Sequence, residues 1–278
     1  MEPLNPQKTR VRDLLRDDDL RRWYNNVAHG ARKTADNYAR TLSRFCERIG
    51  QTPKGYAALG TKEREDLLQD EIARLALEDK TSEARNVKKA VVSWLAHNGV
   101  RVNRQIRLPR IQERKRNRRH ATPEELRAAI RGADLRARAA IAFLALGGQR
   151  EEVMGTYRGT DGLRIRDIVD AHIDEGTGIL NFDRIPVRIL VRPGLSKVGH
   201  TYFFFLGPEG VGYLDGYMRD RVAIGEKLTP DSALITLAPE RLGLWRERGK
   251  QFISTRNIAD FIRKPMRTAG IDDLTPYA

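Results

Sequence analysis

The amino-acid sequence predicts a mainly α-helical protein with a small antiparallel β-sheet, arranged as two domains. Apolar residues recur at helical spacing through residues 10–98, and strand-like runs separated by turn dipeptides fall between residues 163 and 206. A basic stretch at 99–121 separates the two parts. The chain has 278 residues, of which 40% are hydrophobic, so it has enough apolar material for two cores of ordinary size.

The charge balance favours a polyanionic partner. The net charge is +14 and the isoelectric point about 10.1, which is typical of nucleic-acid-binding proteins, with an anionic membrane surface as the rival partner. No stretch approaches the ~20 apolar residues needed to cross a bilayer, and residues 1–5 lack the apolar core of a signal peptide. Cys46 is the single cysteine, which excludes an intramolecular disulfide. We therefore expect an intracellular protein with no membrane partner.

The first domain is predicted to be a compact bundle of four short helices. Their inward faces carry leucine, isoleucine, valine and aromatic residues at helical spacing, and glycine or asparagine follows several of them. The four expected helices are the segment from Leu14 to Val27, the segment capped by Thr34 and ended by Gly50, residues 62–77, and a helix from Thr81 or Ser82 to Asn98.

The stretch 99–121 is predicted to contact a phosphate backbone. Its basic residues recur every three positions and then almost consecutively, with Glu113 as the only acid between 101 and 119. A solvated linker is the alternative, but nine basic residues against one acid favour a strap across nucleic acid. The basic residues are Arg101, Arg104, Arg107, Arg110, Arg114, Lys115, Arg116, Arg118 and Arg119.

The second domain is predicted to place a small antiparallel sheet between helical segments. Thr122 is a capping residue, and it is followed by Pro123 at the first helical position and by two acids in the first turn. An apolar helix at 136–146 then ends at Gly147-Gly148. The later expected elements are strands at 179–182, 187–191 and 201–206, a helix at 211–222, a short apolar segment at 233–235 and a helix at 254–268.

Three short segments carry candidate chemistry. Arg150 directly follows the apolar helix and its glycine turn, so its guanidinium can emerge from the core and bind a phosphate; an ordinary helix-terminal arginine is the alternative. Lys197 lies between two predicted strands, where it can reach into a groove; a solvated hairpin lysine is the alternative. The third segment runs from Leu274 to Tyr277, shortly after the last predicted helix.

In this order, after a helical bundle and a basic linker, the three segments resemble the tyrosine recombinases, the phage-integrase-type site-specific DNA recombinases. Residues 33–98, with Thr34 and Phe45, resemble the helical core-binding (SAM-like) domain of that family, and residues 122–278 resemble most of its mixed α/β catalytic domain. The resemblance implies a core-binding domain at 1–98, a basic linker at 99–121 and a C-terminally incomplete catalytic domain at 122–278.

The resemblance also implies roles for individual residues. Arg150 would hold the non-bridging oxygens of the scissile phosphate. Arg164 is the alternative first arginine, because the residues around Arg164 resemble the family's arginine motif in sequence. Lys197 would be the general acid for the leaving 5′ oxygen. Tyr277 occupies the usual histidine position, where a phenol can still bond to phosphate. The other expected DNA contacts are Lys33, Arg40, Arg85, Lys88 and Arg256.

The implied activity is breakage and rejoining of duplex DNA through a 3′-phosphotyrosyl intermediate, without a metal or other cofactor. Self-association as a tetramer on paired DNA sites is implied as well. The five histidines show no ligand spacing with Cys46, which agrees with the absence of a metal site. The implied setting is the cytoplasm of a prokaryotic cell, on DNA that includes a mobile genetic element.

The second arginine and the tyrosine nucleophile of the family would follow Ala278. The 278 residues are therefore expected to bind DNA but not to cleave it alone. The alternative is a non-catalytic DNA-binding fragment that regulates recombination sites. An RNA-binding or topoisomerase-like protein is a more remote possibility.

Overall fold

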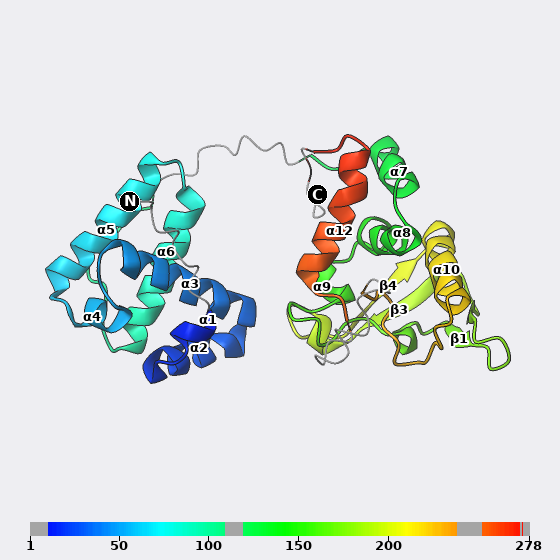
Figure 1. The fold of residues 1–278 in the computed structure, drawn as a ribbon, viewed down its shortest axis with the longest axis horizontal. Helices are drawn as coiled ribbons and strands as arrows, with labels where there is room; N and C mark the ends of the chain where they lie inside the picture. Colours follow the sequence, from blue (N-terminus) through cyan, green and yellow to red (C-terminus); the bar gives the residue numbers. More distant parts are fainter. Residues whose placement is uncertain (1–10, 109–118, 238–251, 273, 275–278) are drawn as a thin grey trace, which may run out of the picture. The chain divides into compact units, whose positions relative to one another are not determined.

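The computed structural model describes residues 11–108, 119–237, 252–272 and 274. The chain divides into two compact units, Met1–Arg114 and Lys115–Ala278, each with its own apolar core (Figure 1). The described residues are mainly helical, with two small antiparallel sheets in the second unit. The predicted fold class is therefore confirmed, although the strands form two sheets instead of one.

The first unit is a helical bundle around two tryptophans. The rings of Trp23 and Trp94 pack edge to face with centroids 5.5 Å apart. The ring nitrogen of Trp23 donates to Ser93 Oγ at 3.0 Å, and that of Trp94 donates to the Pro53 carbonyl at 2.8 Å, so neither buried N–H is left unbonded. The helices are α1 (Val11–Leu14), α2 (Asp18–Gly30), α3 (Arg32–Arg48), α4 (Pro53–Ala58), α5 (Thr61–Leu77) and α6 (Thr81–His97).

The helix boundaries of the first unit differ from the prediction in three places. Thr34 is not a cap, because α3 runs through it and has Ala31 as its N-cap. The first predicted helix is interrupted before Asp17, whose carboxylate caps α2. α4 is an additional helix, capped by Thr52, whose hydroxyl accepts from the Gly55 N–H at 3.0 Å. A helix of six residues is too short for helical periodicity to reveal it.

The first residues of the predicted linker pack onto the first unit. Ile106 is buried in its core, and the Ile106 carbonyl accepts from Lys88 Nζ at 2.7 Å. The buried carboxylate of Glu65 accepts from the backbone N–H groups of Asn103 and Arg104 at 2.6 and 3.2 Å. The packed unit therefore continues past its predicted boundary.

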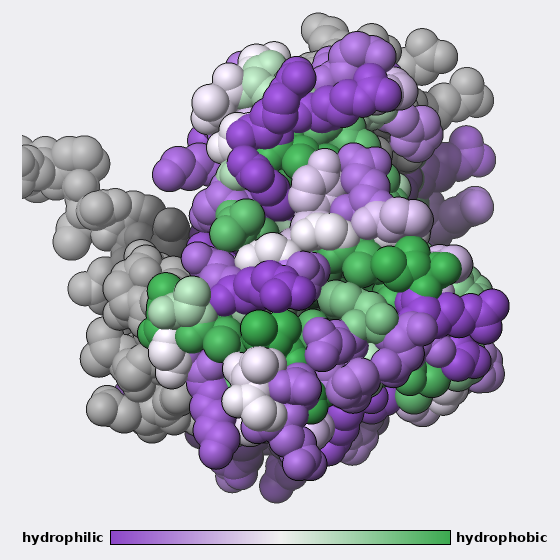
Figure 2. Space-filling model, turned by 90° about the vertical axis from the view of Figure 1, so that its right-hand side faces the viewer, coloured by the Kyte–Doolittle hydropathy of each residue, from purple (hydrophilic) through white to green (hydrophobic). Residues whose placement is uncertain are grey.

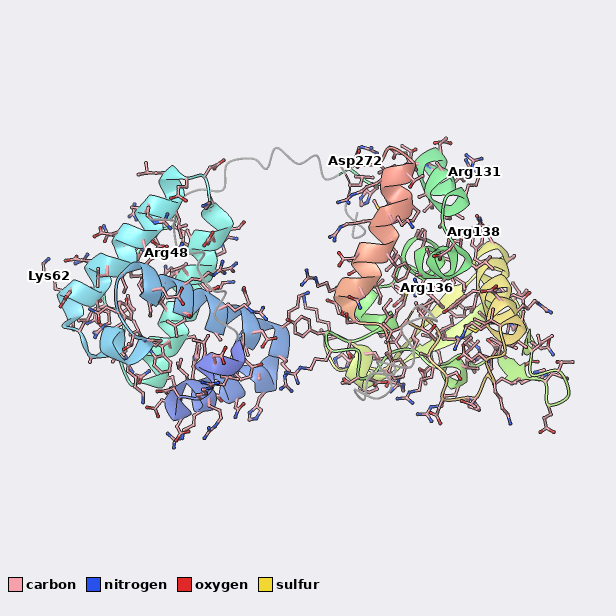
Figure 3. The ribbon with its side chains drawn as sticks, viewed as in Figure 1. Arg48, Lys62, Arg131, Arg136, Arg138 and Asp272 are labelled. Atoms are coloured by element: carbon pink, nitrogen blue, oxygen red, sulfur yellow. The ribbon has the colours of Figure 1, made fainter. Side chains whose placement is uncertain are left out.

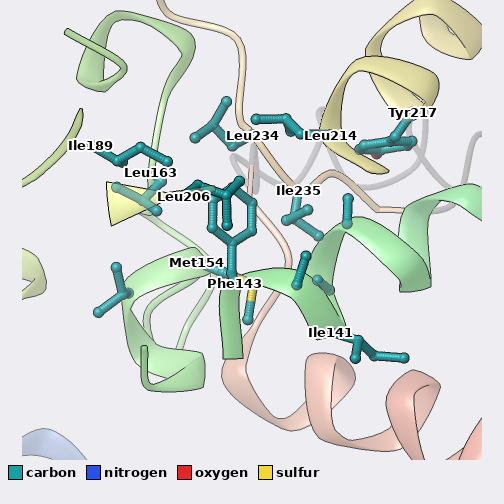
Figure 4. Close-up of a cluster of buried hydrophobic side chains, with 14 of the residues drawn as sticks. Ile141, Phe143, Met154, Leu163, Ile189, Leu206, Leu214, Tyr217, Leu234 and Ile235 are labelled. Atoms are coloured by element: carbon teal, nitrogen blue, oxygen red, sulfur yellow. The ribbon is translucent and has the colours of Figure 1, made fainter. Parts of the chain in front are cut away.

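The second unit packs helices against two antiparallel sheets, in which β1 (Ala171–Ile173) pairs with β2 (Leu180–Phe182), and β3 (Val187–Val191) pairs with β4 (Tyr202–Leu206). In its core, Phe143 lies among Met154, Leu206 and Ile235 (Figure 4). The elements are α7 (Pro123–Arg131), α8 (Leu135–Ile141), the π-helix η1 (Ala142–Leu146), α9 (Glu151–Met154), the 3₁₀ helix η2 (Ile165–Asp167), β1 (Ala171–Ile173), β2 (Leu180–Phe182), β3 (Val187–Val191), the 3₁₀ helix η3 (Pro193–Leu195), β4 (Tyr202–Leu206), α10 (Pro208–Ala223) and α12 (Thr255–Thr268).

The predicted elements of the second unit lie close to their expected positions. Thr122 caps α7 in a reciprocal capping box with Glu125, and Gly148 ends the apolar helix with φ at +64°. The last turn of that helix is a π-helix, which the sequence pattern does not reveal. α10 begins at Pro208, earlier than predicted, with this proline in its first turn.

A tight backbone crossing joins the connection after α9 to the segment before α12. A Cβ added to Gly155 would lie 1.8 Å from the Ile253 carbonyl oxygen, far closer than any real contact. The Thr255 hydroxyl donates to the Gly155 carbonyl at 2.9 Å, which holds the two segments together. The crossing therefore requires glycine at position 155.

Gly155→Ala should destabilise the second unit by about 3 kcal/mol, because two packed backbone segments must separate to admit the methyl group. Urea or thermal unfolding measures the difference. Gly212→Ala is the matched control, since nothing lies within 4 Å of a Cβ added there in α10, and it should be neutral or slightly stabilising. Equal unfolding midpoints for the two variants would contradict the crossing.

Candidate active site

Arg150 reaches the surface on a short, fixed turn. The π-helix η1 ends at Gly147, and the Gln149 N–H donates back to the Phe143 carbonyl at 3.0 Å. A Cβ on Gly147 would lie 2.8 Å from that carbonyl oxygen and 3.0 Å from the ring of Phe204, so the turn packs too closely for a larger residue. Arg150 is the N-cap of α9 and its side chain is exposed. The buried helix thus presents a guanidinium to solvent.

Lys197 lies in the connection between β3 and β4. The buried side chain of Leu195 anchors this connection in the core, and Gly199 turns the chain with φ at +75°. The Lys197 side chain is exposed. In the part of the chain that the structure describes, no carboxylate lies within ion-pair distance of Arg150 or Lys197.

β4 holds these two segments together. The Tyr202 hydroxyl donates to Gln149 Oε1 at 2.9 Å, and the ring of Phe204 packs against Phe143 with centroids 5.9 Å apart. Burial raises the pKa of Tyr202, while the nearby positive charge of Arg150 acts to lower it. Arg150 and the hairpin of Lys197 are therefore neighbours in the fold. The sequence does not single out Tyr202, because a cross-segment hydrogen bond leaves no local pattern.

Arg164, the alternative first arginine, is occupied by other groups. Its guanidinium contacts Asp161 at 3.3 Å and Asp231 at 3.1 Å, and it stacks on the ring of Phe252 at 4.9 Å. Only 19% of its side chain is exposed. Asp161 is shared with Arg192 and Asp231 with Arg166. A guanidinium already bonded to carboxylates is a poor phosphate ligand, so the geometry favours Arg150.

A largely apolar cavity of about 600 Å³ opens beside Arg150. Its walls come from α7, α8, η1 and α12, and its polar rim includes His120 and Arg150. The apolar lining includes Leu126, Ile141, Leu144, Ile262, Ile271 and Leu274.

Comparison with known proteins identifies the fold. No protein-family model matches the sequence, and no curated protein matches it. A XerA recombinase structure is 19% identical and aligns over 94% of this chain and 80% of its own, with a TM-score of 0.38. A lambda integrase dimer bound to a COC′ core site is 16% identical and aligns over 91% of this chain and 77% of its own, with a TM-score of 0.51. The chain has the fold of a tyrosine recombinase.

Within this tyrosine-recombinase fold, much of the basic surface is neutralised by acids of the same unit. In the first unit, Arg48 pairs with Glu71 at 2.7 Å and Lys62 with Asp66 at 2.6 Å. Figure 3 labels Arg48 and Lys62 on this unit. On one face of the second unit, hydrophilic and hydrophobic side chains are interspersed (Figure 2). A DNA contact must therefore be argued for each basic residue separately.

Four of the predicted DNA contacts are engaged within their own unit: Arg256 lies 3.8 Å from Asp260, and three others make closer contacts. Arg104 pairs with Asp66 at 2.6 Å, and Lys88 donates to a backbone carbonyl at 2.7 Å. Arg119 forks onto the Glu125 carboxylate at 2.6 and 2.7 Å. These contacts fix the ends of the linker, and they leave the three side chains less available to phosphate than the sequence suggests.

The other predicted contacts fall into two groups. Those that the structure describes are the exposed Lys33, Arg40, Arg101 and Arg107 and the half-buried Arg85. Those outside the described residues are Arg110, Arg114, Lys115, Arg116 and Arg118, together with Tyr277.

Other candidate chemistries are few in the described ranges. Burial raises the pKa of the Cys46 thiol to about 12, so this cysteine is not a nucleophile near neutral pH. No three His, Cys, Asp or Glu side chains of the described residues gather as metal ligands. The helices in the same ranges are too short or too polar to span a bilayer.

Proposed function

We propose that the protein is a site-specific DNA recombinase or integrase that breaks and rejoins strands through a 3′-phosphotyrosyl intermediate. The observation that carries the proposal is the placement of Arg150 and Lys197. Both side chains are exposed without an acidic partner among the described residues, and Tyr202 joins their segments. The similarity of the fold to that of lambda integrase supports the same conclusion.

In this proposal the two cations act on one phosphodiester. The Arg150 guanidinium binds the non-bridging oxygens and stabilises the charge that develops on them. A tyrosine hydroxyl loses its proton to solvent water and its oxygen attacks the phosphorus, the bond to the 5′ oxygen breaks, and Lys197 Nζ delivers the proton that this oxygen takes up. Tyr277 is proposed as a further phosphate ligand. No metal or other cofactor is required by these steps.

The proposed partner is double-stranded DNA, in keeping with a net charge of +14. We propose further that the protein assembles as a tetramer on paired sites. Its setting would be the cytoplasm of a prokaryotic cell, where it would act in recombination or integration of a mobile genetic element.

Affinity for duplex DNA should fall steeply with salt, because binding releases the cations condensed on the phosphates. If 6 or more phosphates are contacted, the dissociation constant should rise by roughly 1,000-fold between 50 and 200 mM salt. Fluorescence anisotropy with a labelled duplex measures this dependence. An affinity that barely changes over this range would contradict phosphate-dominated binding.

A matched pair of linker variants sharpens the test. Arg107→Gln removes an exposed cation and should reduce the slope of log affinity against log salt by about 1. Arg104→Gln removes a cation that is paired with Asp66, so it should lower stability while leaving the slope unchanged. Equal slopes for both variants would argue against the linker as the DNA-contacting strap.

The reaction class is tested with two labelled duplexes and the protein expressed from its complete reading frame. We expect recombinant strands that join the two duplexes. If the protein relaxes a supercoiled plasmid but forms no strands that join the two duplexes, it is a topoisomerase. Binding without any cleavage would indicate a non-catalytic regulator of recombination sites.

A further inference from the structure

Arg192 directly follows β3, where the chain enters the turn that carries Lys197. Its guanidinium makes a bidentate contact with Asp161, with Nη1–Oδ2 and Nη2–Oδ1 distances of 3.0 Å each. Nε donates to Asp167 at 3.1 Å, and Nη2 also donates to the Gly162 carbonyl at 2.8 Å. All three guanidinium nitrogens are therefore bonded to one segment of the chain.

That segment follows the helix that begins after Arg150. The Leu163 N–H donates to the Val153 carbonyl at 3.1 Å, which ties the segment back to α9. The backbone of Asp161 is fixed as well, because the Thr156 N–H donates to its carbonyl at 2.9 Å. The guanidinium fork thus reaches the part of the chain that positions the candidate phosphate ligand.

The turn on the other side is closed by backbone hydrogen bonds. The Leu195 N–H donates to the Arg192 carbonyl at 2.9 Å, and the Gly199 N–H donates to the Ser196 carbonyl at 3.2 Å. Lys197 lies inside this short, hydrogen-bonded connection. Arg192 and Lys197 are therefore the start and the middle of one hydrogen-bonded connection.

We propose that Arg192 is a positioning residue, which holds the Lys197 turn in register with Arg150 through Asp161 and Asp167. This inference rests on the proposed function, in which the two cations act on one phosphodiester. Arg192 is not itself a phosphate ligand, because only 26% of its side chain is exposed and its guanidinium is bonded to Asp167 and to Asp161, which it shares with Arg164.

The electrostatics of the contact agree with this role. Burial alone would raise the pKa of Asp161, but hydrogen bonds from Arg192 and from the Gly162 N–H bring it below its ordinary value. The hydrogen bond to Asp161 raises the pKa of Arg192 in turn. Both groups are charged at neutral pH, so the fork is intact under the conditions of DNA cleavage.

Arg192→Gln removes the fork, and its effect should be confined to the step that Lys197 assists. The assay is single-turnover cleavage of a suicide duplex by the protein from its complete reading frame. We expect cleavage to slow by about 100-fold, a typical consequence of misplacing a reacting group by about 1 Å. With sulfur in place of the bridging 5′ oxygen, variant and wild type should cleave at similar rates. Thiols are much more acidic than alcohols, so the departing thiolate needs no proton.

Arg188→Gln is the matched control. Arg188 lies near the other end of β3, and its Nε and Nη2 lie 2.6 to 3.1 Å from the carboxylate oxygens of Asp170. The substitution therefore removes an equivalent contact that does not adjoin the Lys197 turn. Arg188→Gln should cleave the ordinary substrate at the wild-type rate. Arg192→Lys keeps the charge but not the fork and should be slowed less than Arg192→Gln. If circular dichroism shows that Arg192→Gln does not fold, Arg192→Lys is the variant used to test the inference.

Slow cleavage of the oxygen substrate with recovery on the sulfur substrate supports the inference. Equal slowing on both substrates, or no slowing in any folded Arg192 variant, overturns it. If the wild-type protein forms no covalent product on either substrate, the proposed function itself fails, and the positioning role fails with it.

Discussion

In the protein from its complete reading frame, Arg150→Ala should slow strand cleavage by about 100- to 1,000-fold, the usual cost of removing one group that stabilises charge in a transition state. Duplex affinity should change little, because many other cations contact the phosphate backbone. Single-turnover cleavage and anisotropy titration on the same preparation separate the two effects. A sulfur leaving group should not rescue this variant, since Arg150 is proposed to act on the non-bridging oxygens.

Arg164→Ala is the control for this assignment. It removes contacts with Asp161 and Asp231, so it should cost about 1–3 kcal/mol of stability. The folded fraction should still cleave. A large loss of cleavage in Arg164→Ala at unchanged stability, with normal cleavage by Arg150→Ala, would reverse the choice between the two arginines.

Lys197→Ala should slow cleavage of an ordinary duplex by about 100- to 10,000-fold, the range typical of general acid catalysis. The same variant should recover on a substrate with a bridging 5′ sulfur, because that leaving group departs without a proton. Rate measurements on the two substrates give the ratio directly.

Lys227→Ala is the control for Lys197, since Lys227 is another exposed lysine of the same unit. It should cleave both substrates at the wild-type rate. If Lys197→Ala is slowed equally on the oxygen and sulfur substrates, Lys197 is not the proton donor and serves only in binding.

The helices and strands were predictable where their signals are local. Thr122 with Pro123 marks the start of α7 correctly, and the run from Val187 to Val191 is β3 as expected. Short or interrupted elements were not predictable: α4 spans six residues, which is less than two turns. Ala31 caps α3 without a side-chain bond, so no residue type reveals that boundary.

The candidate site was predictable only in part. Arg150 and Lys197 stand beside glycine turns that sequence reading detects, whereas their proximity depends on Tyr202 meeting Gln149 across 53 residues of chain. Arg192 gave no signal, because its carboxylate partners lie 25 and 31 residues away. Contacts between distant segments are set by tertiary packing, and a single sequence does not record them.

Covalent capture tests the central claim most directly. The protein from its complete reading frame is incubated with a nicked suicide duplex, digested, and analysed by mass spectrometry. We expect one tyrosine peptide joined to a 3′ phosphate, with a free 5′ hydroxyl on the released strand, and a much smaller yield from Arg150→Ala. No adduct, or a peptide joined to a 5′ phosphate, would contradict the assignment of a tyrosine-type recombinase.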